Sequence, residues 1–146
     1  MIVLVGLTES VVAAPGGEPV PLVERIQFVV DRLRAELGIS HPVNVAVLPQ
    51  VALVVSVEAP ADDSQPFRLA IEDRFLARLD DAEVDAAIAH ELGHVWLFTH
   101  HPYLQTERLA NQIAMRVVPR ESLVNVYQKL WAHGATRGNL DAFLGP

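Results

Sequence analysis

The sequence predicts an α+β fold in which one helix and three strands precede a group of three helices. Apolar residues recur at helical spacing before residue 38, alternate with polar residues between residues 43 and 71, and return to helical spacing after residue 80. Strands that follow one another directly favour a small mixed or antiparallel sheet. The chain has 146 residues, of which 51% are hydrophobic, so we expect residues 1–146 to form one minimal domain with its own core.

The first helix is expected over residues 20–37. Apolar side chains share one face there, and Gly38 follows at the position where a glycine commonly ends a helix. Alternation and β-branched residues then predict strands, because successive side chains of a strand point to opposite faces. The predicted strands are residues 43–48, 51–57 and 67–71, followed by a short helical turn around residues 75–79.

Three helices are expected in the second half of the chain. The first begins after Asp80 and ends near Thr99, since an aspartate followed three residues later by Glu83 is typical of a capping box. The other two are expected from Leu104 to Val118 and from Pro119 to Gly134. The residues that follow contain glycine and are expected to form a tail.

Composition restricts the partners and the kind of site. The net charge of −7 argues against nucleic acid and anionic membranes as main partners. No apolar run is long enough to span a bilayer, so we expect a soluble protein, in the cytoplasm rather than secreted. Residues 1–7 are apolar and are expected to form a short strand or an ordered tail, with a trimmed signal sequence as the alternative. Because the chain has no cysteine, a metal site would need histidine and carboxylate ligands.

The segment around residue 90 reads His-Glu-x-x-His. On a helix, residues four apart lie on the same face, so His90 and His94 can point two imidazoles at one metal ion. Glu91 follows the first histidine and can act as a general base on a water molecule beside that ion. This pattern is typical of zinc hydrolases. The alternative is a buried helix that carries two histidines for no chemical reason.

A catalytic zinc usually takes three protein ligands, and Glu107 is the first candidate for the third. It shares one face of its predicted helix with Ala110, Asn111 and Ala114, and the alanines would allow close packing against the helix of the two histidines. Asn111 lies one turn after Glu107 and could orient a ligating imidazole by a hydrogen bond. The alternative is an exposed glutamate that the helix dipole stabilises.

His100 is the second candidate. The motif followed six residues later by a histidine matches the outer frame of H-E-x-x-H-x-x-G-x-x-H. However, Leu97 stands where that pattern has the glycine that turns the chain, and position 100 of a continuous helix does not share the face of His94. We therefore expect His100 and His101 to be solvated residues at a helix end.

At these residues the chain resembles the gluzincin metallopeptidases. Residues 80–95, DDAEVDAAIAHELGHV, are similar to the active-site helix of the M48 (HtpX-type) peptidases and the minigluzincins. Residues 107–119, ERLANQIAMRVVP, are similar to the glutamate helix of the ImmA/IrrE (M78) family. The resemblance covers about residues 67–119. It departs from the M48 pattern at Asn111, where an aspartate is common.

The resemblance implies a zincin-like peptidase with one zinc per chain, held by His90, His94 and Glu107, and with Glu91 as general base. Its substrate would be a peptide or protein. The oxyanion donor is expected to be His133 or Tyr127.

In such peptidases the substrate lies along an edge strand beside the active-site helix. We expect residues 67–71 to be that edge strand and to bind the peptide by β-augmentation. The alternative function is a metal-binding or latent module that regulates or binds a partner without turnover. The sequence leaves the oligomeric state open.

Overall fold

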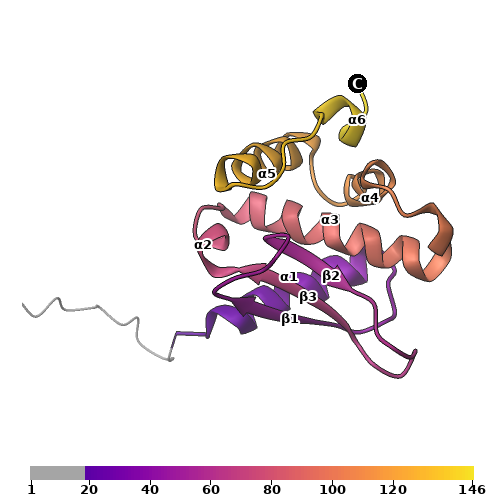
Figure 1. The fold of residues 1–146 in the computed structure, drawn as a ribbon. Coiled ribbons are helices and arrows are strands. Elements are labelled where there is room, and N and C mark those ends of the chain that lie inside the picture. Colours follow the sequence, from indigo (N-terminus) through magenta and orange to yellow (C-terminus); the bar gives the residue numbers. More distant parts are fainter. Residues whose placement is uncertain (1–18) are drawn as a thin grey trace, which may run out of the picture.

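The computed structural model describes residues 19–146, and its elements confirm the predicted α+β fold class. The expectation for residues 1–7 lies outside the described residues. The elements are α1 (Leu22–Glu36), β1 (Val43–Leu48), β2 (Val55–Glu58), β3 (Phe67–Glu72), α2 (Asp73–Leu76), α3 (Asp81–His100), the 3-10 helix η1 (Pro102–Leu104), α4 (Glu107–Ala114), α5 (Arg120–His133) and α6 (Leu140–Leu144) (Figure 1).

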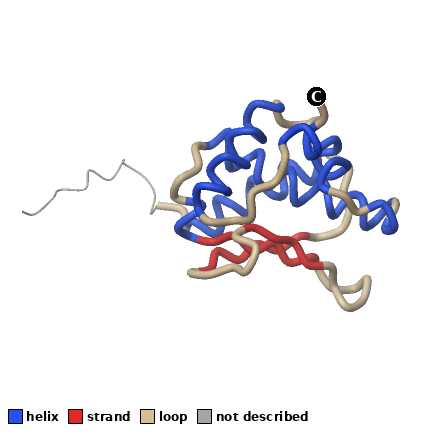
Figure 2. Tube along the Cα trace, turned by 45° about the horizontal axis from the view of Figure 1, so that its top comes forward, coloured by secondary structure: helices blue, strands red, loops and turns tan. Residues whose placement is uncertain are grey.

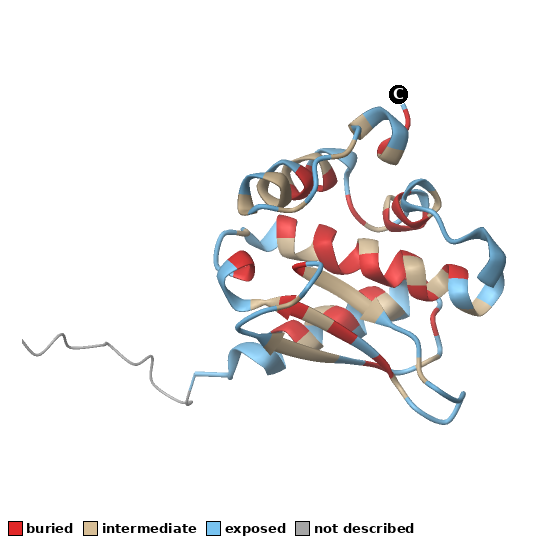
Figure 3. Cartoon of the chain, in the orientation of Figure 1, coloured by how far each residue is buried: buried red, intermediate tan, exposed pale blue. Residues whose placement is uncertain are grey.

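Helix α3 lies in the middle of the molecule. Figure 1 shows it running between the sheet and α1 on one side and α4, α5 and α6 on the other. In the turned view of Figure 2 the strands gather along one side, with the helices on the other. Figure 3 shows buried residues spread along α3, which fits a helix covered on several sides.

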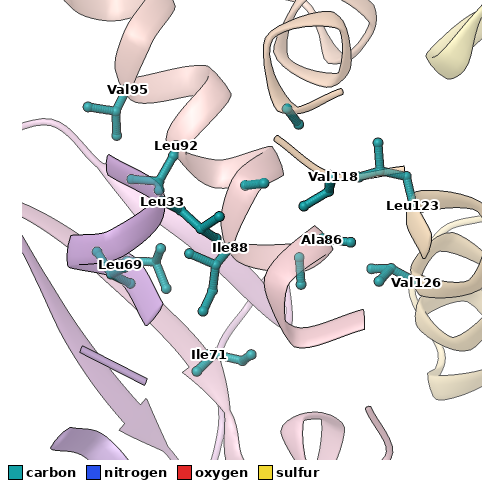
Figure 4. Close-up of a cluster of buried hydrophobic side chains, with 14 of the residues drawn as sticks. Leu33, Leu69, Ile71, Ala86, Ile88, Leu92, Val95, Val118, Leu123 and Val126 are labelled. Atoms are coloured by element: carbon teal, nitrogen blue, oxygen red, sulfur yellow. The ribbon is translucent and has the colours of Figure 1, made fainter. Parts of the chain in front are cut away.

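The core forms on two sides of α3 (Figure 4). On the sheet side, the buried residues include Leu33, Leu69, Ile71, Ile88 and Leu92. On the side of the C-terminal helices they include Ala86, Val118, Leu123 and Val126. Since both sides of α3 are packed, its position is determined by the sheet and by the C-terminal helices together.

The capping box at the start of α3 is confirmed. The Asp80 side chain accepts a hydrogen bond from the Glu83 backbone N–H at 2.8 Å, and the Glu83 carboxylate accepts one from the Asp80 N–H at 2.9 Å. These bonds satisfy two backbone donors that the first turn of a helix leaves free. The helix begins at Asp81, nine residues before His90.

The sheet is mixed, with strand order β1-β3-β2. Strand β3 pairs in parallel with β1 and antiparallel with β2. The prediction that residues 67–71 form an edge strand is therefore wrong. The chain inserts β3 between β1 and β2, which leaves β2 at an edge of the sheet. Leu69 and Ile71 of β3 are fully buried.

Strand β2 is shorter than predicted because residues 51–54 form a turn. Val54 has a φ of 69°, and the N–H of Val55 donates to the Leu53 carbonyl at 2.8 Å, the hydrogen bond of a γ-turn. A β-branched residue with positive φ is strained, so the surrounding structure must hold this turn in place.

The start of one helix and the presence of another also differ from the predictions. The helix that carries the glutamate starts at Glu107 and not at Leu104, because the Thr106 side chain caps it by accepting from the Leu109 N–H. Helix α6, capped by Asn139, was not predicted, since five residues are too few to show a helical period. None of the described helices has both the length and the apolar run needed to cross a membrane.

Candidate metal centre

Helices α3 and α4 bring together two imidazoles and one carboxylate. The Nε2 atom of His90 lies 3.1 Å from Glu107 Oε2, and that of His94 lies 3.4 Å from Glu107 Oε1. One ligand atom from each of the three residues lies within 4.8 Å of the other two. His90 and His94 share a face of α3, as the spacing predicted, and Glu107 reaches them from the first turn of α4.

The contact of Glu107 with the two histidines depends on a close approach of α3 and α4 at Gly93. A Cβ atom at that position would lie 2.2 Å from the carbonyl oxygen of Ala110. Only glycine therefore allows α4 to pack at this distance from α3. Gly93 stands inside the motif, between the two histidines, so the same five residues provide the imidazoles and the space for the helix that carries Glu107.

The imidazole of His90 is held by a buried hydrogen-bond network. Asn111 is fully buried; its Nδ2 donates to the Phe143 carbonyl at 3.0 Å and to Tyr127 Oη at 2.8 Å. A carbonyl only accepts, so the amide nitrogen must face Phe143, and Oδ1 must face His90 Nδ1 at 2.7 Å. His90 therefore donates through Nδ1, which leaves the lone pair on Nε2 for a cation.

His94 is held in the same tautomer by a different residue. Gln105 Nε2 donates to the backbone carbonyl of His94 at 2.9 Å, so Gln105 Oε1 is the atom that faces His94 Nδ1, also at 2.9 Å. The Nδ1 atom of His94 must donate, and its Nε2 lone pair points toward Glu107. Both imidazoles are thus prepared as acceptors beside a carboxylate, which is also an acceptor.

Three acceptors that converge in this way need a cation between them. Burial alone would lower the pKa of His90, but the hydrogen bond with Glu107 and the charges of Glu91 and Glu107 raise this pKa to about 9. Hydrogen bonds from His90 and His94 lower the pKa of Glu107. In the described geometry a proton satisfies this need, and a metal ion can take its place.

The distances are compatible with a small ion. Ligand bonds of about 2.0–2.1 Å place the corners of a tetrahedron about 3.3–3.4 Å apart. Glu107 Oε2 lies 3.1 Å from the His90 nitrogen and Oε1 lies 3.4 Å from the His94 nitrogen, so either oxygen is near the place of a ligand. Two nitrogens and one oxygen form the donor set of a catalytic zinc site with one open position. The residues therefore fit a metal ion of this kind.

Glu91 is buried beside the cluster and lines the same cavity as the two histidines. Burial raises the pKa of its carboxyl group, while the charges of His90 and His94 oppose that shift. The backbone of Val57 on β2 lies near this carboxylate and favours its charged form, which also opposes the rise in pKa. Glu91 is thus a carboxylate of raised basicity, placed between the candidate metal ligands and the outer strand of the sheet.

The cavity over the site has a volume of about 880 Å³. Its lining includes Phe67 at the first residue of β3, with Val95 and Phe98, and Glu72 at the last residue of β3, with Trp131. His90, His94 and Glu107 line the same cavity. A cavity of this size can hold several residues of an extended peptide.

The structure places the other predicted site residues in different surroundings. The Tyr127 hydroxyl donates to Glu107 Oε2 at 3.3 Å, so it reaches the cluster. His133 lines the cavity, but its Nε2 pairs with Glu72 Oε1 at 2.7 Å. His100 stacks on Trp96 with ring centroids 4.0 Å apart and hydrogen-bonds the Trp96 carbonyl, away from the cluster.

Sequence reasoning missed Gln105, Glu72 and the carbonyl of Phe143. Gln105 lies in the connection before α4, and Phe143 contributes only its backbone, so neither belongs to a pattern with a known chemical meaning. Glu72 directly follows the predicted strand of residues 67–71 and belongs to no motif. Gly93 could have been found, because a glycine inside a helix often marks a close contact with another backbone.

Comparison with known proteins supports the fold. The sequence matches no protein-family model and no curated protein. Among solved structures, the fold is similar to the crystal structure of the metallopeptidase zymogen of Pyrococcus abyssi abylysin, with a TM-score of 0.55. The two chains share 16% identity, and the match covers 75% of this chain and 94% of that chain. The likeness shows a metallopeptidase-like α+β fold and does not assign a specific family.

Proposed function

We propose that this protein is a metal-dependent peptidase of the gluzincin type, with zinc held by His90, His94 and Glu107. The observation that carries the proposal is the convergence of two Nε2 lone pairs and one carboxylate beside a buried glutamate, in a cavity that can hold a peptide. The metallopeptidase-like fold supports the same function. Gln105 and Asn111 would keep both imidazoles in the ligating tautomer.

Zinc in this position would polarise the carbonyl oxygen of a peptide bond and make a water molecule more acidic. Glu91 is the general base of the proposal. Its carboxylate accepts a proton from the attacking water and passes that proton to the nitrogen of the leaving amine. The raised pKa of Glu91, which results from burial, suits both steps because it brings proton affinity closer to neutral pH.

Tyr127 is the better placed of the two expected oxyanion donors. Its hydroxyl lies 3.3 Å from Glu107 Oε2, and its ring packs edge-on against that of His90 with centroids 6.0 Å apart. Burial raises the pKa of Tyr127, so the hydroxyl keeps its proton and can donate it to a developing negative charge. His133 is occupied by Glu72 and is assigned no such role.

The substrate would lie along β2 and not along β3. Strand β2 lines the cavity, its residue Val57 borders Glu91, and among the described strands it pairs only with β3. Its outer edge can therefore hydrogen-bond an extended peptide by strand addition, which fixes the scissile bond near Glu91.

The first test of this proposal is the metal content. We expect about one zinc ion per chain after reloading with zinc and gel filtration, measured by elemental analysis. A stable metal-free protein that takes up no transition metal would overturn the proposal. Bound zinc without turnover of any peptide would instead favour a metal-binding module that acts without catalysis.

The second test is Glu91→Gln, which keeps the shape of the side chain and removes its basicity. We expect metal content and melting temperature to stay near the wild-type values, whereas the rate of peptide hydrolysis falls roughly 10²–10⁴-fold. Cleavage of a quenched fluorescent peptide library measures the rate. Equal rates for the variant and the wild type would exclude Glu91 as the base.

A further inference from the structure

The cavity lining contains a second polar group, the pair of Glu72 and His133. The side chains are 14% and 12% exposed, and His133 Nε2 lies 2.7 Å from Glu72 Oε1. Both residues line the cavity together with Phe75 and Trp131. Neither residue contacts the metal cluster, so the proposed mechanism leaves this pair without a role.

Within the described part of the chain, the Glu72 carboxylate forms no hydrogen bond or ion pair other than that with His133. It stands at the N-cap position of α2, where an acidic side chain commonly accepts from the helix, but its side chain makes no capping bond. Among the described residues, His133 is the only basic side chain within ion-pair distance of it. One carboxylate oxygen is thus bonded to His133, and the other has no hydrogen-bond partner in the described part of the chain.

The backbone places Glu72 near the start of β2. The Glu72 N–H donates to the carbonyl of Val54, the turn residue before β2, at 2.9 Å, and Val57 is the β2 residue that borders Glu91. Three residues of chain span at most about 11 Å, and the turn at Val54 makes this distance shorter. A peptide extended along β2 would therefore place a side chain within about three residues of the scissile bond beside Glu72.

The surroundings of Glu72 favour a long cationic side chain. Phe75, Leu130 and Trp131 provide apolar walls for a methylene stem, and the carboxylate can accept from a charged nitrogen at its end. The guanidinium of Arg137, which does not line the cavity, lies 5.6 Å from the centroid of the Trp131 ring, and an aromatic ring of this kind attracts cations. Phe67, at the first residue of β3, and Phe98 contribute apolar side chains to another part of the lining.

We propose that Glu72, held in place by His133, is a specificity residue that binds a lysine or arginine side chain of the peptide substrate. This inference rests on the proposed peptidase function of the neighbouring cluster. A charge-assisted hydrogen bond in a partly buried site contributes enough binding energy to set a preference of about tenfold or more.

The test uses a peptide series in which lysine or norleucine occupies each position around the scissile bond in turn. We expect zinc-loaded wild type to prefer lysine at one position by about tenfold or more in kcat/KM. In Glu72→Gln the lysine-to-norleucine ratio of kcat/KM should fall to about one. In Glu72→Lys, a peptide with glutamate at that position should become the preferred substrate. Asp63→Asn, which removes an exposed carboxylate outside the cavity, should keep the wild-type ratio.

Calorimetric binding of the same peptides in the zinc-loaded Glu91→Gln background separates this proposal from the peptidase function. Lysine peptides that bind tighter than norleucine peptides, with the difference lost on adding Glu72→Gln, would support the subsite even if no peptide were cleaved. If Glu72→Gln is too unstable, Glu72→Asp replaces it, with a reduced ratio expected. Equal ratios for Glu72 variants and wild type, or equal binding of both peptides by the wild type, would overturn the proposal.

Discussion

The two histidines of the candidate metal centre have the same tautomer but are held by different parts of the molecule. His90 is bonded to Asn111, which is fully buried and is itself fixed by Tyr127 and Phe143. His94 is bonded to Gln105, an exposed residue in the connection between η1 and α4. One imidazole depends on the C-terminal helices α5 and α6, and the other depends on a local turn.

The difference predicts which histidine partner contributes to the stability of the fold and which affects mainly metal affinity. The network of Asn111 leaves no donor or acceptor free, so removing one member leaves buried polar groups without partners. Gln105 lies at the surface, where water can replace a lost hydrogen bond. We therefore expect changes around His90 to affect folding and metal affinity together, and changes around His94 to affect metal affinity mildly.

The largest expected effect belongs to Glu107, which both histidines share. Glu107→Ala removes one of three ligands, and zinc affinity should fall by more than about a hundredfold, beyond the range typical of outer hydrogen-bond partners. Competition with a chromophoric chelator measures the affinity. His100→Ala is the matched control and should bind zinc as the wild type does, because His100 stacks on Trp96. The opposite ranking of the two variants would exclude Glu107 as the third ligand.

The centre could be predicted from the sequence where short-range geometry determines it. The spacing of His90 and His94 and the capping box at Asp80 depend only on helical periodicity, which local sequence fixes. The choice of Glu107 over His100 followed from the direction in which a continuous helix presents its residues. Asn111 was expected to orient an imidazole, and it does contact His90.

Other features depend on contacts between distant residues and could not be predicted. The sequence does not show that β3 lies between β1 and β2, because the alternation in residues 67–71 fits either a central or an edge strand. The partners of Asn111 include the carbonyl of Phe143, 32 residues away, and a backbone carbonyl has no sequence signature. The pairing of Glu72 with His133 joins residues 61 positions apart.

The next largest effect is expected at Asn111. Asn111→Leu keeps the volume and removes all hydrogen bonds, so zinc affinity should fall about 10–100-fold, and the melting temperature of the metal-free protein should drop. Asn111→Asp keeps an acceptor for His90 but places a carboxylate against the Phe143 carbonyl. We expect it to retain more zinc affinity than the leucine variant while it still destabilises the fold. Equal zinc affinity of the leucine variant and the wild type would show that His90 needs no such partner.

The smallest effect is expected at Gln105, and it tests the comparison most directly. Gln105→Ala removes the acceptor of His94 Nδ1 and the donor to the His94 carbonyl, but both groups lie near the surface, and His94 is 21% exposed. Water can replace both bonds, so zinc affinity should fall less than about tenfold, at the low end for an outer partner. The unfolding midpoint in urea should stay close to the wild-type value, because no buried group loses its partner. A loss as large as that of Asn111→Leu would mean that the two histidines are held equally firmly, and that burial of the partner does not decide the strength of its support.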